Sequence, residues 1–554
     1  MKKYPIAFCL VLVLFSCKKT KTTTTTPPII VPATFATTSV SLNGSTQLPF
    51  KFVPLLPVIK IGFSAKINSA TIPANVLFKQ ASGTAVNFNA ATENGDSVLV
   101  LRPAVNLSGL TNFSVTVSSG LQSQQSVSLG TAVNYTFTTG IDSANKFPVI
   151  TDSALLDLVQ RQNFKYFWEF GHPTSGLARE RNNSGDLVTS GGSGFGIMAI
   201  PVAIKRNFIT RAEGLTRMQK MVGFLKTTAQ TFHGAYPHWL NGNTGVVIPF
   251  STKDNGADLV ETSYLIAGLL AARQYFNGAD AAETNLRNDI NVIWNRVEWN
   301  WFRQGTQNTL YWHWSPNYNW EMNHQIKGWN EALITYVMAA SSTTYTIPKT
   351  VYDNGWATGS AFKNGNTYFG YQLPLGPNLG GPLFFEHYSF MGINPNGLAD
   401  AHASYTTQTK NHTLINYNYC KANPKGFYGY SNLCWGLTAS DVQNGYAANS
   451  PTSDIGTISP TAALSSFPYT PAESMQALKF FYYVLGDKIW KEYGFVDAFS
   501  LNDLWFANSF LAIDQGPIIV MIENYRSGLL WNLFTSCPEV KTGLTKLGFT
   551  APYL

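Results

Sequence analysis

The sequence has little charge, little cysteine and no metal-binding spacing. Charged residues make up 12% of the 554 residues, against roughly 25% in typical soluble domains. The net charge is only +7, and no basic cluster follows Lys21, so nucleic acid is not an expected partner. Five scattered cysteines do not indicate a disulfide framework, and no His, Cys and Asp cluster has metal-ligand spacing. We expect no cofactor and no metal.

Apolar runs of membrane-spanning length are also lacking. The run Ile6 to Phe15 is far shorter than the ~20 residues that span a bilayer. It follows Met1-Lys2-Lys3 and ends in Leu14-Phe15-Ser16-Cys17, so residues 1–17 are similar to a lipoprotein signal peptide with Cys17 as the lipidated residue. An ordinary signal peptide that contains a cysteine is the alternative. We expect export and a lipid anchor in the cell envelope, on the periplasmic side or at the outer-membrane surface.

The remaining chain is rich enough in apolar residues, at 45%, to exclude a disordered protein. Residues 18–33 are rich in Thr and Pro, as in a tether. Residues 34–140 alternate short apolar runs such as Phe113 to Val117 with turn residues such as Asn94-Gly95-Asp96. This spacing predicts an all-β sandwich, which resembles bacterial Ig-like modules and would serve as a spacer, a cleft wall or a sugar-binding module.

After a linker at 141–150, the apolar spacing becomes helical. Long loops rich in Trp, Tyr, Asn and Gly separate the predicted helices. Such loops favour a helical barrel with a site at one end over a plain bundle, whose loops are short. One helix start is marked by Thr470-Pro471-Ala472-Glu473, with Pro at the first helical position. The expected helices are 153–170, 194–205, 210–231, 257–276, 281–299, 328–340, 397–420, 471–485, 502–511 and 516–534.

Carboxylates are scarce, with 31 Asp and Glu in all, and the densest group is Asp254, Asp258 and Glu261. Asp258 and Glu261 are three residues apart, so they share a face at a helix start. Crowded acids repel one another, which raises at least one pKa and favours a proton donor at neutral pH. The same spacing also fits a capping box, with Asp258 as N-cap. The two interpretations are compatible.

Two further acids lie among aromatic residues. Glu331 in Gly328-Trp329-Asn330-Glu331 begins an apolar stretch, where the helix dipole alone would favour an acid. Glu321 lies in a loop beside Trp320 and is a candidate for binding sugar hydroxyls.

Aromatic loops indicate a carbohydrate ligand, because the apolar faces of sugars stack on rings while their hydroxyls need polar partners. About half of these rings are expected to be core residues. A polar loop before Ser190–Gly194 and further loop acids add hydrogen-bonding groups, while the low Lys and Arg content of the proposed cleft argues against a uronate substrate. The candidate substrate-binding residues are Arg179, Glu180, Asp186, Tyr236, Trp239, Trp312, Trp314, Glu321, His324, Glu386, His387, Trp435 and Asp441.

From about Thr151 to the end, the chain resembles glycoside hydrolase family 144, whose members are also called glucoamylase-like. The motifs that carry the resemblance occur in order: Arg161–Trp168 (RQNFKYFW), Gly176–Arg181 (GLARER), Asp258–Tyr264 (DLVETSY), Gly328–Glu331 (GWNE), Gly381–Tyr388 (GPLFFEHY), Trp435–Asp441 (WGLTASD) and Ala512–Pro517 (AIDQGP). The resemblance implies a multidomain protein, an Ig-like sandwich followed by an all-α (α/α)6 barrel over 151–554.

The same resemblance implies hydrolysis of β-1,2-glucan with inversion, and it places the essential acids at Asp254, Asp258, Glu261 and Glu331. We interpret Glu331 as the general acid and the 254–261 cluster as the water-activating side, because an inverting pair is separated by about 6.5–9.5 Å. Exo action that releases sophorose from the non-reducing end is the first hypothesis. An endo-glucanase and a non-catalytic glycan-binding surface lipoprotein are the alternatives. A monomer is expected.

Overall fold

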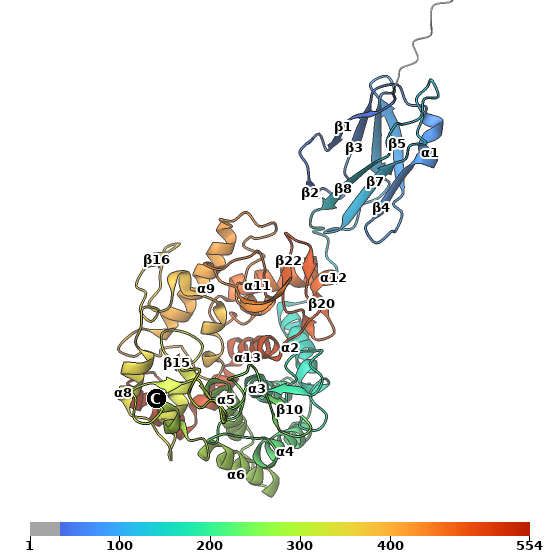
Figure 1. Ribbon diagram of the computed structural model, residues 1–554. Helices are drawn as coiled ribbons and strands as arrows, with labels where there is room; N and C mark the ends of the chain where they lie inside the picture. The colour runs from blue at the N-terminus through green and yellow to red at the C-terminus, as the bar shows by residue number, and fades with distance from the viewer. Residues whose placement is uncertain (1–33) are drawn as a thin grey trace, which may run out of the picture. The chain divides into compact units, whose positions relative to one another are not determined.

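The computed structural model describes residues 34–554, and the chain divides into two compact units after Gly140 (Figure 1). The expected signal peptide, its Cys17 and the tether lie outside the described residues. None of the helices that the model describes is both long enough and apolar enough to cross a membrane.

The first unit is the predicted Ig-like β sandwich. One sheet has the order β1-β3-β6-β5 and the other β2-β8-β7-β4. The strands alternate buried and exposed side chains, as half-buried strands do, and both sheets contribute to one apolar core, for example Ile61 and Leu99 from one and Phe113 and Phe137 from the other. The strands are β1 Thr37–Leu42, β2 Phe50–Val53, β3 Ile59–Phe63, β4 Val76–Gln80, β5 Phe88–Glu93, β6 Val98–Pro103, β7 Asn112–Val117 and β8 Val133–Thr139, with the short helix α1 at Ile72–Asn75.

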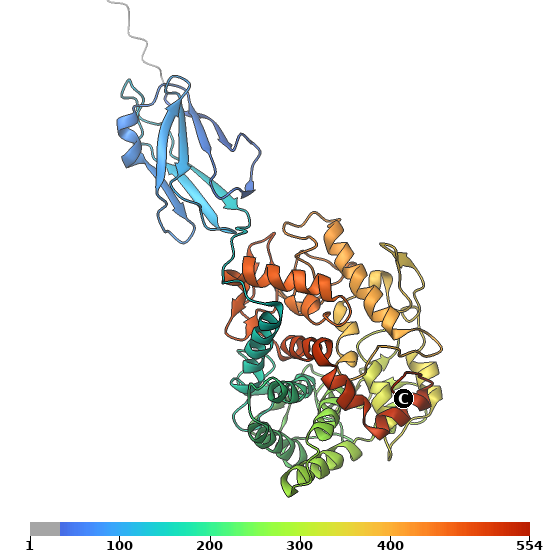
Figure 2. The ribbon, with the colours of Figure 1, turned by 180° about the vertical axis from the view of Figure 1, so that it is seen from behind.

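The second unit is the predicted helical domain (Figures 1 and 2). It contains α2 Asp152–Trp168, α3 Ser190–Lys205, α4 Arg211–Thr227, α5 Leu259–Tyr275, α6 Ala281–Asn295, α7 Leu333–Ser341, α8 Lys349–Val351, α9 Tyr405–Ala422, α10 Pro460–Leu464, α11 Pro471–Lys479, α12 Gly486–Ile489, α13 Ala512–Ser527, α14 Leu529–Thr535 and α15 Pro538–Leu547.

Short strands stiffen the loops between these helices. They are β9 Leu187–Thr189, β10 Trp239–Asn241, β11 Val247–Ile248, β12 Ala257–Asp258, β13 Leu310–Tyr311, β14 His313–Trp314, β15 Gln325–Ile326, β16 Thr367–Tyr368, β17 Tyr371–Gln372, β18 Ala439–Val442, β19 Gly445–Ala448, β20 Trp490–Lys491, β21 Gly494–Phe495, β22 Phe499–Ser500 and β23 Trp505–Phe506.

The core of this unit is built on α3, α5, α7 and α13, which are buried nearly all round. Helices that are apolar on every side belong inside a protein, whereas α4 and α6 bury one face only. Helices α3 and α5 pack closely because Gly194 has no side chain: a Cβ at this position would overlap the carbonyl of Tyr264. Their amino ends lie beside that of α13, since Gly192 contacts Ala512. The inner helices therefore present their amino ends at one end of the unit.

The structure corrects two expected helices. The range 502–511 is no helix: it contains β23, and Leu504 has a left-handed φ of 52°, which a helix interior excludes. The region 328–340 becomes helical only at Leu333, so Glu331 lies in the preceding turn. The expected linker at 141–150 belongs to the second unit, where Phe147 stacks on Tyr482 at 4.6 Å between ring centroids.

Candidate active site

Asp258 is the central member of a cluster of buried carboxylates at the start of α5. Its Oδ1 accepts hydrogen bonds from the backbone N–H groups of Val260 (3.0 Å) and Glu261 (2.9 Å), so it is the N-cap of the helix. Its Oδ2 lies 3.1 Å from Nδ1 of His238 and accepts from Nε1 of Trp312 at 3.3 Å. Burial would raise the pKa of Asp258, but these donors and the charges around it hold that pKa below its usual value.

His238 carries the counter-charge. Burial lowers the pKa of this imidazole, but the negative charges of Glu261, Asp258 and Asp254 outweigh burial and raise the pKa to about 9. At neutral pH the group is therefore an imidazolium beside a carboxylate. A charge-assisted pair of this kind compensates for the loss of solvent by both groups.

Asp254 lies in the loop before α5 and has a different environment. Its Oδ2 is 3.3 Å from Nε2 of His313, and burial together with the charge of Asp258 raises its pKa to about 7. Burial lowers the pKa of His313 to about 4, so this imidazole is neutral near pH 7. Asp254 consequently exchanges a proton in the neutral range, while Asp258 stays ionised.

Glu261 joins α5 to α3. Its Oε2 accepts from the backbone N–H of Gly191 at 2.9 Å, and burial raises its pKa. The N–H of Asp258 donates to the carbonyl of Tyr236 at 2.9 Å. Asp258 thus caps the helix, as the spacing suggested. The reciprocal half of the capping box, a hydrogen bond from the N–H of Asp258 to the Glu261 side chain, is absent, so that side chain faces α3.

Glu331 lies close to this cluster, in the turn before α7. Its carbonyl oxygen accepts from the hydroxyl of Tyr264 on α5 at 3.3 Å. Burial, with the charges of Glu261 and Asp258, raises the pKa of the Glu331 carboxyl to about 7. A carboxyl group that keeps its proton near neutral pH is suited to general acid catalysis.

A second polar cluster lies around Arg181. Its Nε donates to Oε2 of Glu180 at 2.8 Å, and its NH1 lies 3.2 Å from Oδ2 of Asp441. The N–H of Asp441 donates to Oδ2 of Asp497 at 2.6 Å. Asp497 is buried, which raises its pKa to about 7. Glu180 and Asp441, both expected at the site, are therefore held in one network by Arg181.

An aromatic groove of about 370 Å³ joins the two clusters. Its lining includes Trp239, His238 and Phe250 together with Glu180 and Arg181. Apolar walls with a few polar groups are typical of small-molecule sites.

The other predicted binding residues with exposed surface make the following contacts. Trp312 stacks on His324 with centroids 4.9 Å apart. Trp314 meets His233 edge-on at 5.1 Å between ring centroids. Glu321 pairs with Lys253 at 2.6 Å between Oε1 and Nζ. Asp186, whose side chain is 55% exposed, lies 3.1 Å from His172.

Five predicted binding residues make contacts within the protein and do not line the groove. Tyr236, Glu386, His387 and Trp435 are completely or almost completely buried. The Glu386 carboxylate accepts from Nε1 of Trp329 and lies 2.8 Å from Nδ1 of His412. The guanidinium of Arg179 donates hydrogen bonds to the carbonyls of Gly185 and Phe170, both at 2.7 Å. Motif position does not reveal burial, and these residues support the loops behind the site.

The predicted site does not include His238, His313 or Arg181, although their side chains contact its acids. His313 reaches Asp254 and Asp258 because β12 pairs with β14, and two-residue strands leave no periodic signal. The ligand atoms of His238, Asp254 and Asp258 lie within 4.8 Å of one another, so this set could hold a cation. The four donors already on Asp258 argue against that use.

Family models match both units of the chain. The Glycoamylase model, described as "Putative glucoamylase", matches residues 323–538, and a bacterial Ig-like domain model matches residues 24–139. The exo beta-1,2-glucooligosaccharide sophorohydrolase (non-reducing end) of Parabacteroides distasonis is 46% identical over 443 residues, which are 75% of this chain. The chain spans 61% of the length of that curated relative.

Two solved structures are similar. The endo-beta-1,2-glucanase of Chitinophaga pinensis, solved with sophorotriose and glucose, is 51% identical with a TM-score of 0.71, and the match covers 73% of this chain and 100% of that one. The beta-1,2-glucanase of Parabacteroides distasonis is 38% identical with a TM-score of 0.71, over 90% of this chain and 73% of that one. The helical unit therefore has the α/α-barrel fold of glucoamylase-like enzymes.

Proposed function

The chain belongs to the glucoamylase-like family, and from that premise we propose that it is a glycoside hydrolase that cleaves β-1,2-linked glucooligosaccharides. The observation that carries the proposal is Glu331, a carboxyl with a pKa raised to about 7 beside ionised Asp258. Glu331 can serve as the proton donor, and Asp254 in the cluster before α5, whose pKa is also raised to about 7, can serve as the base. Relatives with β-1,2-glucan activity support the choice of linkage.

In the proposed mechanism, Glu331 protonates the oxygen of the glycosidic bond as that bond breaks. Asp254 accepts a proton from the attacking water, because its pKa of about 7 suits a base at neutral pH. Asp258 has both oxygens occupied by protein donors, so it orients His238 and caps α5. Attack by water opposite the leaving group inverts the anomeric carbon.

We propose exo action that releases sophorose from the non-reducing end, as the name of the curated relative describes. The endo-glucanase similarity makes endo action the second candidate. A timed product analysis on linear β-1,2-glucan, with β-1,3-glucan, β-1,4-glucan and starch as controls, decides between them. Sophorose alone from the earliest time supports exo action, whereas a ladder of sizes supports endo action. No product from any glucan overturns the enzyme proposal and favours a glycan-binding protein.

We also propose that the protein is exported, lipid-anchored through Cys17 and monomeric. The charged start, the short apolar run and Cys17 support the anchor. Expression of Cys17→Ser beside the unaltered chain tests it: the unaltered chain should enter the detergent phase and incorporate labelled palmitate. Equal behaviour of the two chains would exclude the anchor. Light scattering of the protein without residues 1–17 measures the mass in solution.

A further inference from the structure

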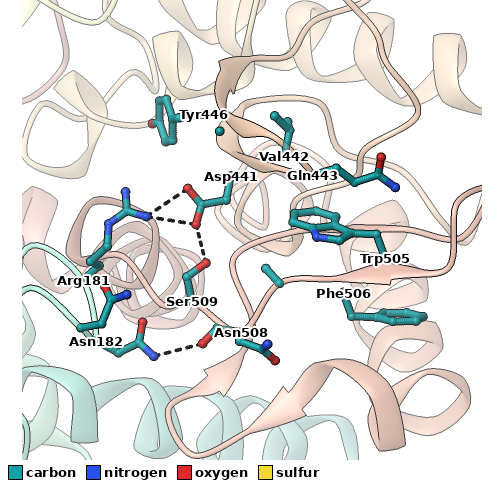
Figure 3. A pocket seen from close by; sticks show the side chains of 13 residues that line it. Arg181, Asn182, Asp441, Val442, Gln443, Tyr446, Trp505, Phe506, Asn508 and Ser509 are labelled. Atoms are coloured by element: carbon teal, nitrogen blue, oxygen red, sulfur yellow. Dashed lines mark hydrogen bonds and ion pairs between the residues drawn. The ribbon is translucent and has the colours of Figure 1, made fainter. Parts of the chain in front are cut away.

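A second hollow, of about 590 Å³, lies beside the Arg181 cluster. Its walls come from the β18–β19 hairpin, from the β22–β23 region and from residues 181–183. Figure 3 shows Trp505 across from Arg181, with Asp441 and Ser509 between them. This volume lies within the range of ligand-binding pockets, and none of the catalytic steps above uses it.

The hollow continues the groove that contains His238. Arg181 and Tyr446 line both spaces, and Tyr446 is 49% exposed on β19. A chain bound beside Trp239 can therefore extend past Tyr446 toward Trp505. A polymeric substrate needs such an extension, while a small-molecule substrate does not.

The lining suits a neutral polyol. The side chains of Asn183, Gln443 and Asn508 and the indole N–H of Trp505 line the hollow, and among residues 34–554 none of these groups has a hydrogen-bond partner in the protein. The charge of Arg181 is balanced by Glu180 and Asp441, so no uncompensated cation awaits a phosphate or a uronate. Amides provide donors and acceptors for hydroxyls, and an aromatic face packs against pyranose C–H groups.

The Trp505 platform is held in place by its turn. Leu504 has a φ of 52°, a conformation that residues other than glycine seldom adopt. The side chains of Ser500 and Asp503 hold the turn through a hydrogen bond of 2.9 Å. Non-glycine residues in such conformations persist where the surroundings fix them, often at ligand sites.

We propose that this hollow is a distal subsite that binds glucosyl units of the β-1,2-linked chain away from the bond that is cleaved. The proposal rests on the proposed function and deepens it. It makes the rate depend on chain length, because only an oligosaccharide long enough to pass Tyr446 gains contacts with Trp505.

The test measures kcat/KM for β-1,2-glucooligosaccharides of three to eight units. In the unaltered protein kcat/KM should rise with length. In Trp505→Ala the ratio between eight and three units should fall about tenfold, the loss expected of a buried aromatic anchor. Asn508→Ala changes an exposed side chain and should lower the ratio about fivefold. The matched control is Tyr525→Ala. Tyr525 is 44% exposed, lies near the carboxyl end of α13 and does not line the hollow, so this change should leave the ratio unchanged.

The subsite would be overturned if Trp505→Ala and Asn508→Ala are active and their kcat/KM rises with chain length as steeply as that of the unaltered protein. If the unaltered protein hydrolyses none of the oligosaccharides, the proposed function fails, and calorimetric binding of the eight-unit chain then decides the subsite. Weaker binding in the Trp505 and Asn508 variants would support it, and equal binding would overturn it.

Discussion

At the scale of single residues, the carboxyls near α5 differ through their surroundings. Asp258 receives donors on both oxygens and stays charged, whereas Glu331 is half-buried and lies near negative charge, and its pKa rises to about 7. The sequence predicted which acids gather here, because they lie in short motifs. It could not predict their protonation states, since those of Asp254 and Asp258 depend on His238 and, for Asp258, also on His313, which reaches the cluster through the pairing of β12 with β14.

Glu331→Gln should remove the proton donor while keeping the shape of the side chain. We expect kcat to fall by roughly 10²–10⁴-fold, the usual contribution of a general acid. Calorimetric affinity for oligosaccharides and the thermal midpoint should stay close to those of the unaltered protein. A variant with near-normal turnover would remove Glu331 from the acid role.

The pH dependence of kcat/KM should be a narrow bell centred near pH 7. Below the centre Asp254 takes up a proton and the base is lost, and above it Glu331 loses its proton and the acid is lost. Both pKa values are raised to about 7, and kcat/KM reports groups of the free enzyme. Initial rates at low substrate concentration from pH 5 to 9 measure it. A flat profile over that range would contradict both assignments.

Chelation should leave the activity unchanged, because donors from the protein already occupy both oxygens of Asp258. Rates would be compared before and after dialysis against EDTA, and again after Zn²⁺, Mg²⁺ or Ca²⁺ is added. A loss that one of these ions restores would assign a metal to His238, Asp254 and Asp258.

At the scale of elements, the sequence predicted helices where capping signals and apolar spacing coincide. Helix α11 begins at Pro471, as the Thr470-Pro471-Ala472-Glu473 pattern indicates. The same reasoning failed at 502–511, where apolar residues have helical spacing but the turn at Leu504 takes a left-handed backbone. The hairpin pairing of residues 499–500 with 505–506 prevents a helix there despite the spacing.

Asp258→Ala tests whether the start of α5 is an element of stability as well as of the site. The change removes an N-cap, worth ~1 kcal/mol, and leaves the half-buried His238 imidazolium without its nearest carboxylate. We expect the helical unit to lose about 2–4 kcal/mol of stability, measured by urea unfolding. Asp280→Ala, an exposed N-cap on α6, is the control and should shift the midpoint less. Equal shifts would mean that the His238 contact adds nothing.

At the scale of the whole molecule, the Ig-like unit and the helical unit each have a core of their own. The sandwich core contains residues from both of its sheets, and α3, α5 and α13 pack within the helical unit. Because folding of each unit depends on its own core, the helical unit without residues 34–140 should keep its thermal midpoint and its catalytic rate on short substrates.

Deleting residues 34–140 should nevertheless change the products if the sandwich limits how a long glucan enters the cleft. An exo enzyme must prevent the glucan from extending through the cleft beyond the sugars that it releases. An added domain can do so by occupying space, without contributing catalytic groups. We therefore expect the truncated protein to release longer or mixed oligosaccharides from linear β-1,2-glucan, measured by timed chromatography beside the longer chain. If the product ladder is unchanged, the groove of the helical unit alone sets product length, and the sandwich is a spacer.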